Sequence, residues 1–383
     1  MDSSGIVSFY DAVADGNIIW VVDQYHNALE KINIQEQKIS LAALLPVFKD
    51  TKDIRNQYGG ICNDDDRLII IPRNSTHILI YDVITGVFKD IQINSDYISK
   101  GKGYNLFGSP VIYKETLYLI PGTYSKIVKI NLKSLEITYI DYGYEKIFPT
   151  LKSPNRVVIS HGLIVDNILY LTCWQSMEIL KLDLDTGKIH EEKVSVIEDG
   201  ISYLIYDGVF FWTSLRDHPW ILKLDDELKQ VECVKIQKTK KNYEFKSGIR
   251  FLIDADRHMY IVPEFGNAIL RFEKSSETIK KVWEMPLETP EELLGLQVIK
   301  TSVLCAKRMT EKKVILCSLQ DATVLILDTD TNTFVSMNSY LSDKADRDAV
   351  KKYSMDFCNS GTPVRESGFF TINNFIDGVK SRE

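Results

Sequence analysis

The sequence lacks the short motifs that mark several common enzyme classes. Its 383 residues contain no Gly-x-Ser-x-Gly, no Gly-x-x-x-x-Gly-Lys-[Ser/Thr] and no Gly-x-Gly-x-x-Gly motif. Such motifs hold a nucleophilic serine on a strand-to-helix turn, or wrap backbone amides around phosphate groups. Serine hydrolases, P-loop nucleoside triphosphatases and dinucleotide-dependent enzymes are therefore unsupported.

Cysteine is scarce, and its spacing points to no shared site. The six cysteines include no Cys-x-x-Cys pair; they are Cys62, Cys173, Cys233, Cys305, Cys317 and Cys358. Zinc sites and disulfide frameworks in small domains use closely spaced cysteines, so we expect neither. Three of the six fall in apolar stretches, where a free thiol packs like a small hydrophobic side chain. We predict a reduced, cytoplasmic protein that uses no metal and no cofactor.

Long apolar runs and concentrated positive charge are also missing. No stretch has the pattern of a signal peptide or the length of a membrane span. The net charge is -7, and the lysines are dispersed rather than gathered in the stripe that a nucleic-acid surface requires. The sequence thus predicts neither a nucleic-acid partner nor a membrane partner.

What the sequence does contain is a repeat. A strand end followed by a turn recurs at seven places: INIQEQKI (32), YDVITGVF (81), INLKSLEI (130), LDLDTGKI (182), LDDELKQV (224), FEKSSETI (272) and LDTDTNTF (327). By subtraction of these positions, successive copies start 42 to 55 residues apart. The second position is always Asn, Asp or Glu. A short acceptor side chain there can accept hydrogen bonds from the backbone amides of the following turn.

Three further strand-like stretches accompany each copy of the repeat. Apolar runs such as LIIIP at 68 and LYLTC at 169 come before the turn, and they are rich in β-branched or aromatic residues. Another apolar stretch precedes each run across a polar hairpin, and a fourth follows the turn. Four-stranded units of about 40 to 50 residues without intervening helices are typical of β-propellers. We predict an all-β, seven-bladed β-propeller of four-stranded antiparallel blades over residues 1–338.

One stretch resembles the blades of known propellers. Residues 165–189, VDNILYLTCWQSMEILKLDLDTGKI, are similar to repeats of the NHL, gluconolactonase and virginiamycin B lyase propellers. In those repeats a turn, an LYL- or LWF-type strand and an Ile-x-Lys-Leu-Asp-x-x-Thr-Gly hairpin follow in that order. The resemblance covers roughly residues 6–338 at the level of repeats, and it implies the fold. The metal-binding and general-base residues of those families match no positions here, so it implies no site residues.

Residues 339–383 are predicted to form a helical extension that packs on the propeller. Ser342 is a candidate N-cap for a helix formed by good helix formers that follow it. An apolar face with helical spacing indicates a second short helix, formed by Ile372, Phe375, Ile376 and Val379. Whether residues 368–370 add a strand that helps to close the ring stays open.

The candidate ligand face carries the loops between the second and third strands. The chain enters each propeller blade at its innermost strand, so these loops and the segments that link the blades open on one face. The candidate ligand-binding residues there are Asp23, His26, Arg73, Tyr124, Trp174, Arg216, Arg250, Glu264 and Asp321. Converging arginines would suit a carboxylate or phosphate, and a salt-bridged rim is the alternative.

His161 and His218 are candidate catalytic residues. His161 interrupts a recurrence of glycine in the segments that lead into the blades, which places an imidazole near the mouth of the axial channel. The alternative is a structural histidine bonded to a carbonyl of a neighbouring blade. Two functions remain open. One is a recognition module for a small-molecule, peptide, protein or sugar-like ligand at the propeller mouth. The other is a cofactor-independent lyase, lactonase or hydrolase, with a histidine base and arginines that stabilise anions.

Overall fold

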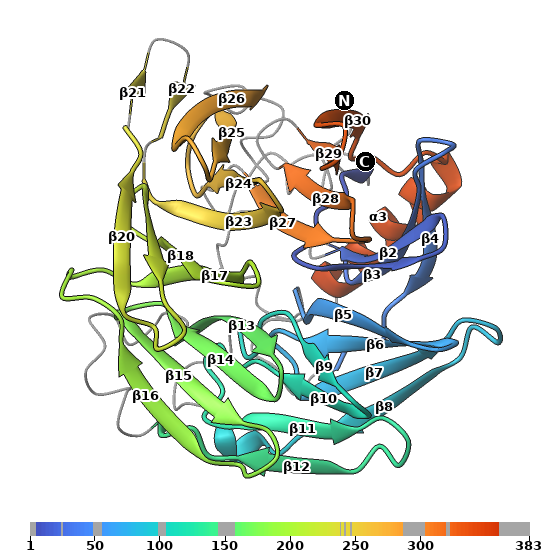
Figure 1. Ribbon diagram of the computed structural model, residues 1–383. Helices are drawn as coiled ribbons and strands as arrows, with labels where there is room; N and C mark the ends of the chain where they lie inside the picture. The colour runs from blue at the N-terminus through green and yellow to red at the C-terminus, as the bar shows by residue number, and fades with distance from the viewer. Residues whose placement is uncertain are drawn as a thin grey trace.

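Seven four-stranded antiparallel sheets, the blades of the propeller, form a ring (Figure 1). The blades follow one another around the ring in the order of the sequence. The computed structural model describes residues 5–23, 26–48, 56–98, 105–144, 158–237, 239–240, 243–245, 247–285, 303–318 and 322–359. Within every blade the strands are hydrogen-bonded in sequence order, from the innermost outward. The predicted all-β, seven-bladed propeller is confirmed.

The bounds of the strands are as follows. Blades 1 to 3 contain β1 (Ala12–Asp15), β2 (Ile18–Asp23), β3 (Ala28–Asn33) and β4 (Lys38–Leu44); β5 (Tyr58–Asp64), β6 (Arg67–Pro72), β7 (His77–Asp82) and β8 (Phe88–Gln92); and β9 (Val111–Tyr113), β10 (Thr116–Leu119), β11 (Ile127–Asn131) and β12 (Ile137–Ile140). Blades 4 and 5 contain β13 (Ile159–Val165), β14 (Ile168–Cys173), β15 (Glu178–Asp183) and β16 (Ile189–Lys193); and β17 (Ile201–Tyr206), β18 (Phe211–Leu215), β19 (Trp220–Leu224) and β20 (Gln230–Lys235). Blades 6 and 7 contain β23 (Ile249–Ala255), β24 (His258–Pro263), β25 (Ala268–Glu273) and β26 (Thr278–Glu284); and β27 (Val303–Arg308), β28 (Lys313–Ser318), β29 (Thr323–Asp328) and β30 (Thr333–Asn338). The remaining elements in the described ranges are a 3-10 turn, η2 (Ser95–Tyr97), a small hairpin of β21 (Thr239–Lys240) and β22 (Tyr243–Glu244), and a helix, α3 (Lys344–Asn359).

The core consists of apolar layers between neighbouring blades. Seven large clusters of buried side chains each combine residues of two adjacent blades, including the first and the last. Tyr170 of β14, for example, packs on Phe211 of β18 with ring centroids 4.8 Å apart. Burying one large apolar side chain contributes about 1.5 to 3 kcal/mol. Each blade therefore depends on both neighbours for the burial of its two faces.

The repeated Asn or Asp caps the turn between the third and fourth strands. Asp183 Oδ1 accepts hydrogen bonds from the amides of Thr186 (2.8 Å) and Asp185 (3.0 Å), and these bonds lower the pKa of that carboxyl. Asn131 Oδ1 bonds the two corresponding amides of its own turn. Equivalent bonds are made by Asn33, Asp82 and Asp328. The predicted role of this repeat position is confirmed in these five blades, while in blade 5 the Asp225 carboxylate accepts from the amide of Lys229 (2.8 Å).

The ring closes through both ends of the described chain. Val7 N donates to Ser339 O (2.9 Å) and Leu341 N donates to Gly5 O (2.9 Å), so the segment before β1 pairs with the segment after β30. Ile6 and Tyr340 form the isolated antiparallel bridge between them. The sequence had left the mode of closure open.

The extension after β30 is fastened to blade 1. Ser342 exchanges hydrogen bonds with Ile39 of β4, and Asp346 Oδ2 accepts from the amide of Leu41 (2.9 Å). The predicted first helix is present as α3, but it begins at Lys344. Because the Ser342 hydroxyl accepts from β4, the residue links the extension to blade 1 instead of acting as the predicted N-cap. The predicted second helix and residues 368–370 lie outside the described residues.

No helix in the described ranges is long and apolar enough to cross a membrane. The cysteines described by the structure are free thiols: Cys62, Cys173, Cys233, Cys305 and Cys317.

Candidate functional site

β-Bulges at the start of the inner strands turn extra side chains toward the propeller axis. The register shifts at the second residue of five inner strands: Gly59, Ser160, Ser202, Arg250 and Leu304. In a regular strand successive side chains point to opposite faces, but a bulge re-aims one of them. Consecutive pairs such as Ser202 and Tyr203 therefore line the same axial cavity.

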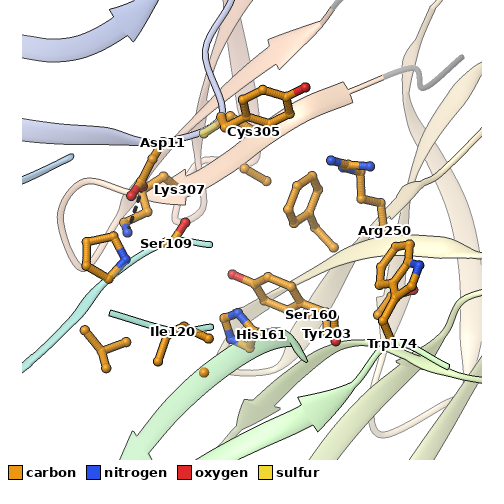
Figure 2. Close-up of a pocket in the computed structure, with 17 residues that line it drawn as sticks. Asp11, Ser109, Ile120, Ser160, His161, Trp174, Tyr203, Arg250, Cys305 and Lys307 are labelled. Atoms are coloured by element: carbon orange, nitrogen blue, oxygen red, sulfur yellow. Dashed lines mark ion pairs between the residues drawn. The ribbon is translucent and has the colours of Figure 1, made fainter. Parts of the chain in front are cut away.

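The axial cavity lies where the inner strands begin. It has a volume of about 160 Å³, and residues of every blade except blade 2 line it. Figure 2 shows side chains of several blades converging on this space. Trp174, one of the lining residues, directly follows β14. The cavity is thus at the face that carries the loops between second and third strands.

An ion pair between Asp11 and Lys307 forms one wall of the axial cavity. Lys307 Nζ lies 2.9 Å from Asp11 Oδ1, and the dashed line in Figure 2 marks this contact. The Asp11 side chain is only 1% exposed and also accepts from the amide of Ala12 (3.0 Å). Burial lowers the pKa of Lys307, but the Asp11 carboxylate more than offsets this and raises it above the usual range. Lys307 is therefore a fixed cation.

His161 lies on the opposite wall and is held as a neutral ring. Its imidazole stacks on Tyr203, with ring centroids 3.9 Å apart and planes inclined by 23°. Burial, reinforced by the charge of Lys307, lowers the pKa of His161 to about 3, although a hydrogen bond to the Leu204 backbone opposes the shift. Among the described residues, no carboxylate and no second histidine is hydrogen-bonded to His161.

Aromatic side chains and an arginine complete the cavity. Phe251 meets the Tyr203 ring edge-on, with centroids 5.4 Å apart. Burial raises the pKa of Tyr203 to about 12, so its hydroxyl stays protonated. Arg250 Nη1 donates to both carboxylate oxygens of Glu264 at 3.0 Å each. The cavity therefore combines flat apolar surfaces with charges whose positions are fixed by ion pairs.

The structure places the three candidate arginines around the axial cavity. Arg250 lines it directly. Arg216 Nη1 donates to the carbonyl of Trp174 (3.0 Å), and Arg216 also pairs with Asp217. The Arg73 guanidinium lies over the ring of Tyr10, a lining residue, at 3.8 Å from the centroid. The arginines thus hold parts of the cavity wall in place.

Other candidate residues make structural contacts away from the cavity. Asp23 is fully buried, pairs with His26 Nδ1 and accepts from the amide of Ser8 (3.3 Å). Tyr124 is also fully buried and donates its hydroxyl to Asn94 O (2.6 Å), so it stabilises the packing of blades 2 and 3. Asp321 lies outside the described residues.

His218 has an acidic partner, unlike His161. Its Nδ1 is 2.7 Å from Asp199 Oδ2, and the Asp199 side chain is fully buried. The amides of Gly200 (2.7 Å) and Asp217 (3.0 Å) donate to Asp199 Oδ1, which fixes the carboxylate. The His218 side chain is 38% exposed. A buried carboxylate that orients an exposed imidazole is the arrangement of a general base and its orienting group.

Two glycines on this face lie where neighbouring blades approach each other closely. A Cβ on Gly200 would lie 1.9 Å from the carbonyl oxygen of Trp174, and one on Gly248 would lie 2.1 Å from that of Arg216. Both oxygens belong to the loop between second and third strands of the preceding blade. Glycine is required where neighbouring blades approach each other backbone to backbone.

The sequence reasoning missed several lining residues, above all Asp11, Lys307 and Tyr203. They lie in or beside inner strands. Because side chains in a regular strand alternate between its two faces, consecutive residues are not expected to face the axis together. The one available signal was Lys307, a charged residue within the otherwise apolar stretch VLCAK at 303. The bulges that re-aim the other residues have no marker in the sequence.

Comparisons with known proteins support the fold. No protein-family model and no curated protein matches the chain. A streptogramin B lyase structure superposes with a TM-score of 0.52 at 14% identity, over 76% of this chain and 85% of the other. A virginiamycin B lyase from Staphylococcus aureus gives 0.54 at 15% identity, over 79% and 89%. The extracellular domain of a hybrid two-component system from B. thetaiotaomicron gives 0.55 at 12%, over 85% and 38%. Identities this low show a shared propeller fold alone.

Proposed function

We propose that the protein is a recognition module that binds a ring-sized part of a small-molecule, peptide, protein or sugar-like ligand in the axial cavity. The observation that carries this proposal is the combination of aromatic walls and fixed charges on the face of the interblade loops. The axial cavity has a volume of about 160 Å³, similar to the ~150 Å³ of a cavity known to hold one benzene ring.

The state of His161 favours binding over catalysis in this cavity. A general base works best when its pKa lies near the operating pH. His161 has a pKa lowered to about 3 and stacks on Tyr203, so it is a poor proton acceptor at neutral pH. A neutral, stacked ring instead adds flat surface to the cavity wall.

Ligand screening by protein-detected NMR tests this proposal. Peptides, saccharides and small ring compounds are titrated into the wild-type protein, and each binder is then titrated into Tyr203→Ala and Trp174→Leu. Both substitutions remove aromatic wall, so we expect at least tenfold weaker binding. Val209→Ala serves as control, because Val209 is 64% exposed in the turn between β17 and β18. Binders that are unaffected by both cavity substitutions would refute the proposal.

A second candidate function rests on the pair of His218 and Asp199. An imidazole held by a buried carboxylate suits a cofactor-independent lyase, lactonase or hydrolase with His218 as general base. Lactone and ester panels are the assay. If this function operates, His218→Gln removes turnover, and Asp199→Asn lowers it while shifting its pH profile. Turnover that His218→Gln leaves unchanged contradicts this role.

We also propose that the protein works in the cytoplasm. The support is the set of free thiols, of which Cys62, Cys173, Cys305 and Cys317 are buried. Reducing compartments keep such thiols unpaired. Fractionation of cells that express the tagged protein tests this assignment, and recovery from an extracellular or periplasmic fraction would contradict it.

A further inference from the structure

We infer that the ligand of the axial cavity carries a carboxylate beside a flat apolar ring, and that Lys307 anchors the carboxylate. This inference rests on the proposed recognition function and adds a ligand class to it. Its first support is the unequal exposure of the Asp11–Lys307 pair. Asp11 is 1% exposed, whereas Lys307 keeps 34% of its side-chain surface exposed and lines the cavity. Lys307 thus offers side-chain surface to a ligand in the cavity, whereas Asp11 offers almost none.

The positive charge of Lys307 acts on the two rings of the opposite wall. The charge of Lys307 lowers the pKa of His161, and no effect of the Asp11 charge accompanies it. At Tyr203, the charge of Lys307 has a larger effect on the pKa than that of Asp11. The positive charge of Lys307 thus acts on both rings of this wall more strongly than the carboxylate of Asp11 does. Arg250 adds a second cation to the lining, although Glu264 shares its charge.

Two residues that line the cavity have hydroxyl groups without a hydrogen-bond partner among the described residues. Tyr10 and Ser202 line the cavity, and their buried hydroxyls have no hydrogen-bond partner among the described residues. Ser202 is only 3% exposed. Buried polar groups in proteins are almost always paired, so a small rotation of either side chain toward the cavity would give its hydroxyl a partner on a ligand that brings acceptors. Hydrogen bonds to a charged acceptor are roughly twice as strong as neutral ones.

The remaining walls fit an apolar ring. Tyr203 lies flat against His161 and meets Phe251 edge-on, so it presents a rigid aromatic surface. Trp174 lines the cavity near Arg250 in Figure 2. A cavity of this size has room for one six-membered ring. The simplest probe with all of these features is benzoate, and benzamide is its neutral counterpart of nearly the same shape.

Isothermal titration with benzoate and benzamide at neutral pH tests the inference. We expect the wild-type protein to bind benzoate roughly ten- to hundredfold more tightly than benzamide, the ratio that a charge-assisted contact supplies. Lys307→Met should abolish this preference by weakening benzoate alone. Lys312→Met is the matched control, because Lys312 belongs to the same blade but is exposed and paired with Asp330. It should leave both affinities unchanged.

A double variant keeps the test valid if Lys307→Met does not fold. Asp11→Asn/Lys307→Met removes both charges of the pair, so no buried carboxylate is left without its partner. It should bind benzamide like the wild-type protein and lose the preference for benzoate. Equal affinities of the wild-type protein for the two probes, or no binding of benzoate, would overturn this inference. The proposed recognition function falls separately, if ligands found by screening are insensitive to Tyr203→Ala and Trp174→Leu.

Discussion

The turns at the outer strands and the axial cavity are built in opposite ways. At the turns, an Asn or Asp at one repeat position caps the same two amides in blade after blade. On the axis, each blade contributes different side chains, and bulges aim consecutive residues such as Arg250 and Phe251 at one space. The turns therefore maintain the ring, while the departures from the repeat create a place for a ligand.

The largest expected effect comes from breaking the charge pair of the axial cavity. Lys307→Met leaves Asp11, 1% exposed, without its partner. We expect the free energy of unfolding to fall by about 3 kcal/mol, at the low end for a broken buried pair because Lys307 is partly exposed. Urea unfolding measures this change. Asp11→Asn/Lys307→Met should recover most of the loss, and a double variant no more stable than the single one would contradict the account.

A smaller effect is expected where neighbouring blades meet backbone to backbone. In Gly200→Ala the new Cβ would lie 1.9 Å from the Trp174 carbonyl oxygen, so the two blades must separate. The expected loss is about 2 kcal/mol, as for other overpacked sites. Gly108→Ala is the control, since a Cβ there has no heavy atom within 4 Å. Equal melting temperatures of the two variants would show that this approach of the blades is not tight.

The pH dependence of the free energy of unfolding tests the lowered pKa of His161. Its pKa is lowered from 6.5 to about 3, so the folded protein binds fewer protons than the unfolded chain between these values. The contribution of His161 is complete above pH 6.5 and declines as the pH falls toward 3. At about pH 5 we expect the free energy of unfolding of the wild-type protein to be about 1 to 2 kcal/mol lower than it is above pH 6.5 because of His161. The His161→Gln variant should not show this loss.

The comparison with His161→Gln also removes an opposing contribution. Burial raises the pKa of Glu30 well above its usual value, so that residue makes the fold less stable as the pH rises. Because both proteins contain Glu30, its effect cancels in the difference between their stability profiles. Parallel profiles for the two proteins would mean that His161 takes up its proton over the same pH range in the folded and unfolded states, which would contradict its lowered pKa.

The smallest effect is expected at the repeated turns. Asn131→Ala removes an acceptor for the amides of Lys133 (3.0 Å) and Ser134 (2.8 Å), and we expect a loss of about 1 kcal/mol in urea unfolding. Asn131→Asp keeps the acceptor and should stay close to the wild-type stability. Because these turns lie outside the axial cavity, both variants should bind every ligand with unchanged affinity. Weaker ligand binding by either variant would show that the turns also contribute to the ligand site, contrary to the account.

The sequence predicts the ring because every blade repeats the same pattern of strands and turns. The caps at Asn33, Asp82 and Asp183, with the apolar runs before them, indicate hairpins at a constant spacing, and seven such units close a propeller. The candidate site was only partly predictable. Trp174, His161 and Arg250 were recognised from loops and segments that lead into the blades, and all three line the axial cavity.

Several other lining residues, among them Asp11, Tyr203 and Lys307, were hidden by the regularity itself. A bulge inserts one extra residue into a strand, and it changes which face every neighbouring side chain occupies. Nothing in the letters around Ser202 and Tyr203 marks that shift. The Asp11–Lys307 pair joins the segment before the first blade to the last blade, a contact between distant parts of the chain that only ring closure creates.

The position of a bound aromatic carboxylate tests the central claim most directly. Crystals of the wild-type protein soaked with 4-bromobenzoate give an anomalous signal that locates the bromine without reference to any assumed site. The account predicts one dominant peak in the axial cavity beside Tyr203, with the carboxylate density directed at Lys307. Bromine peaks confined to the outer surface, with the axial cavity holding only water, would contradict it.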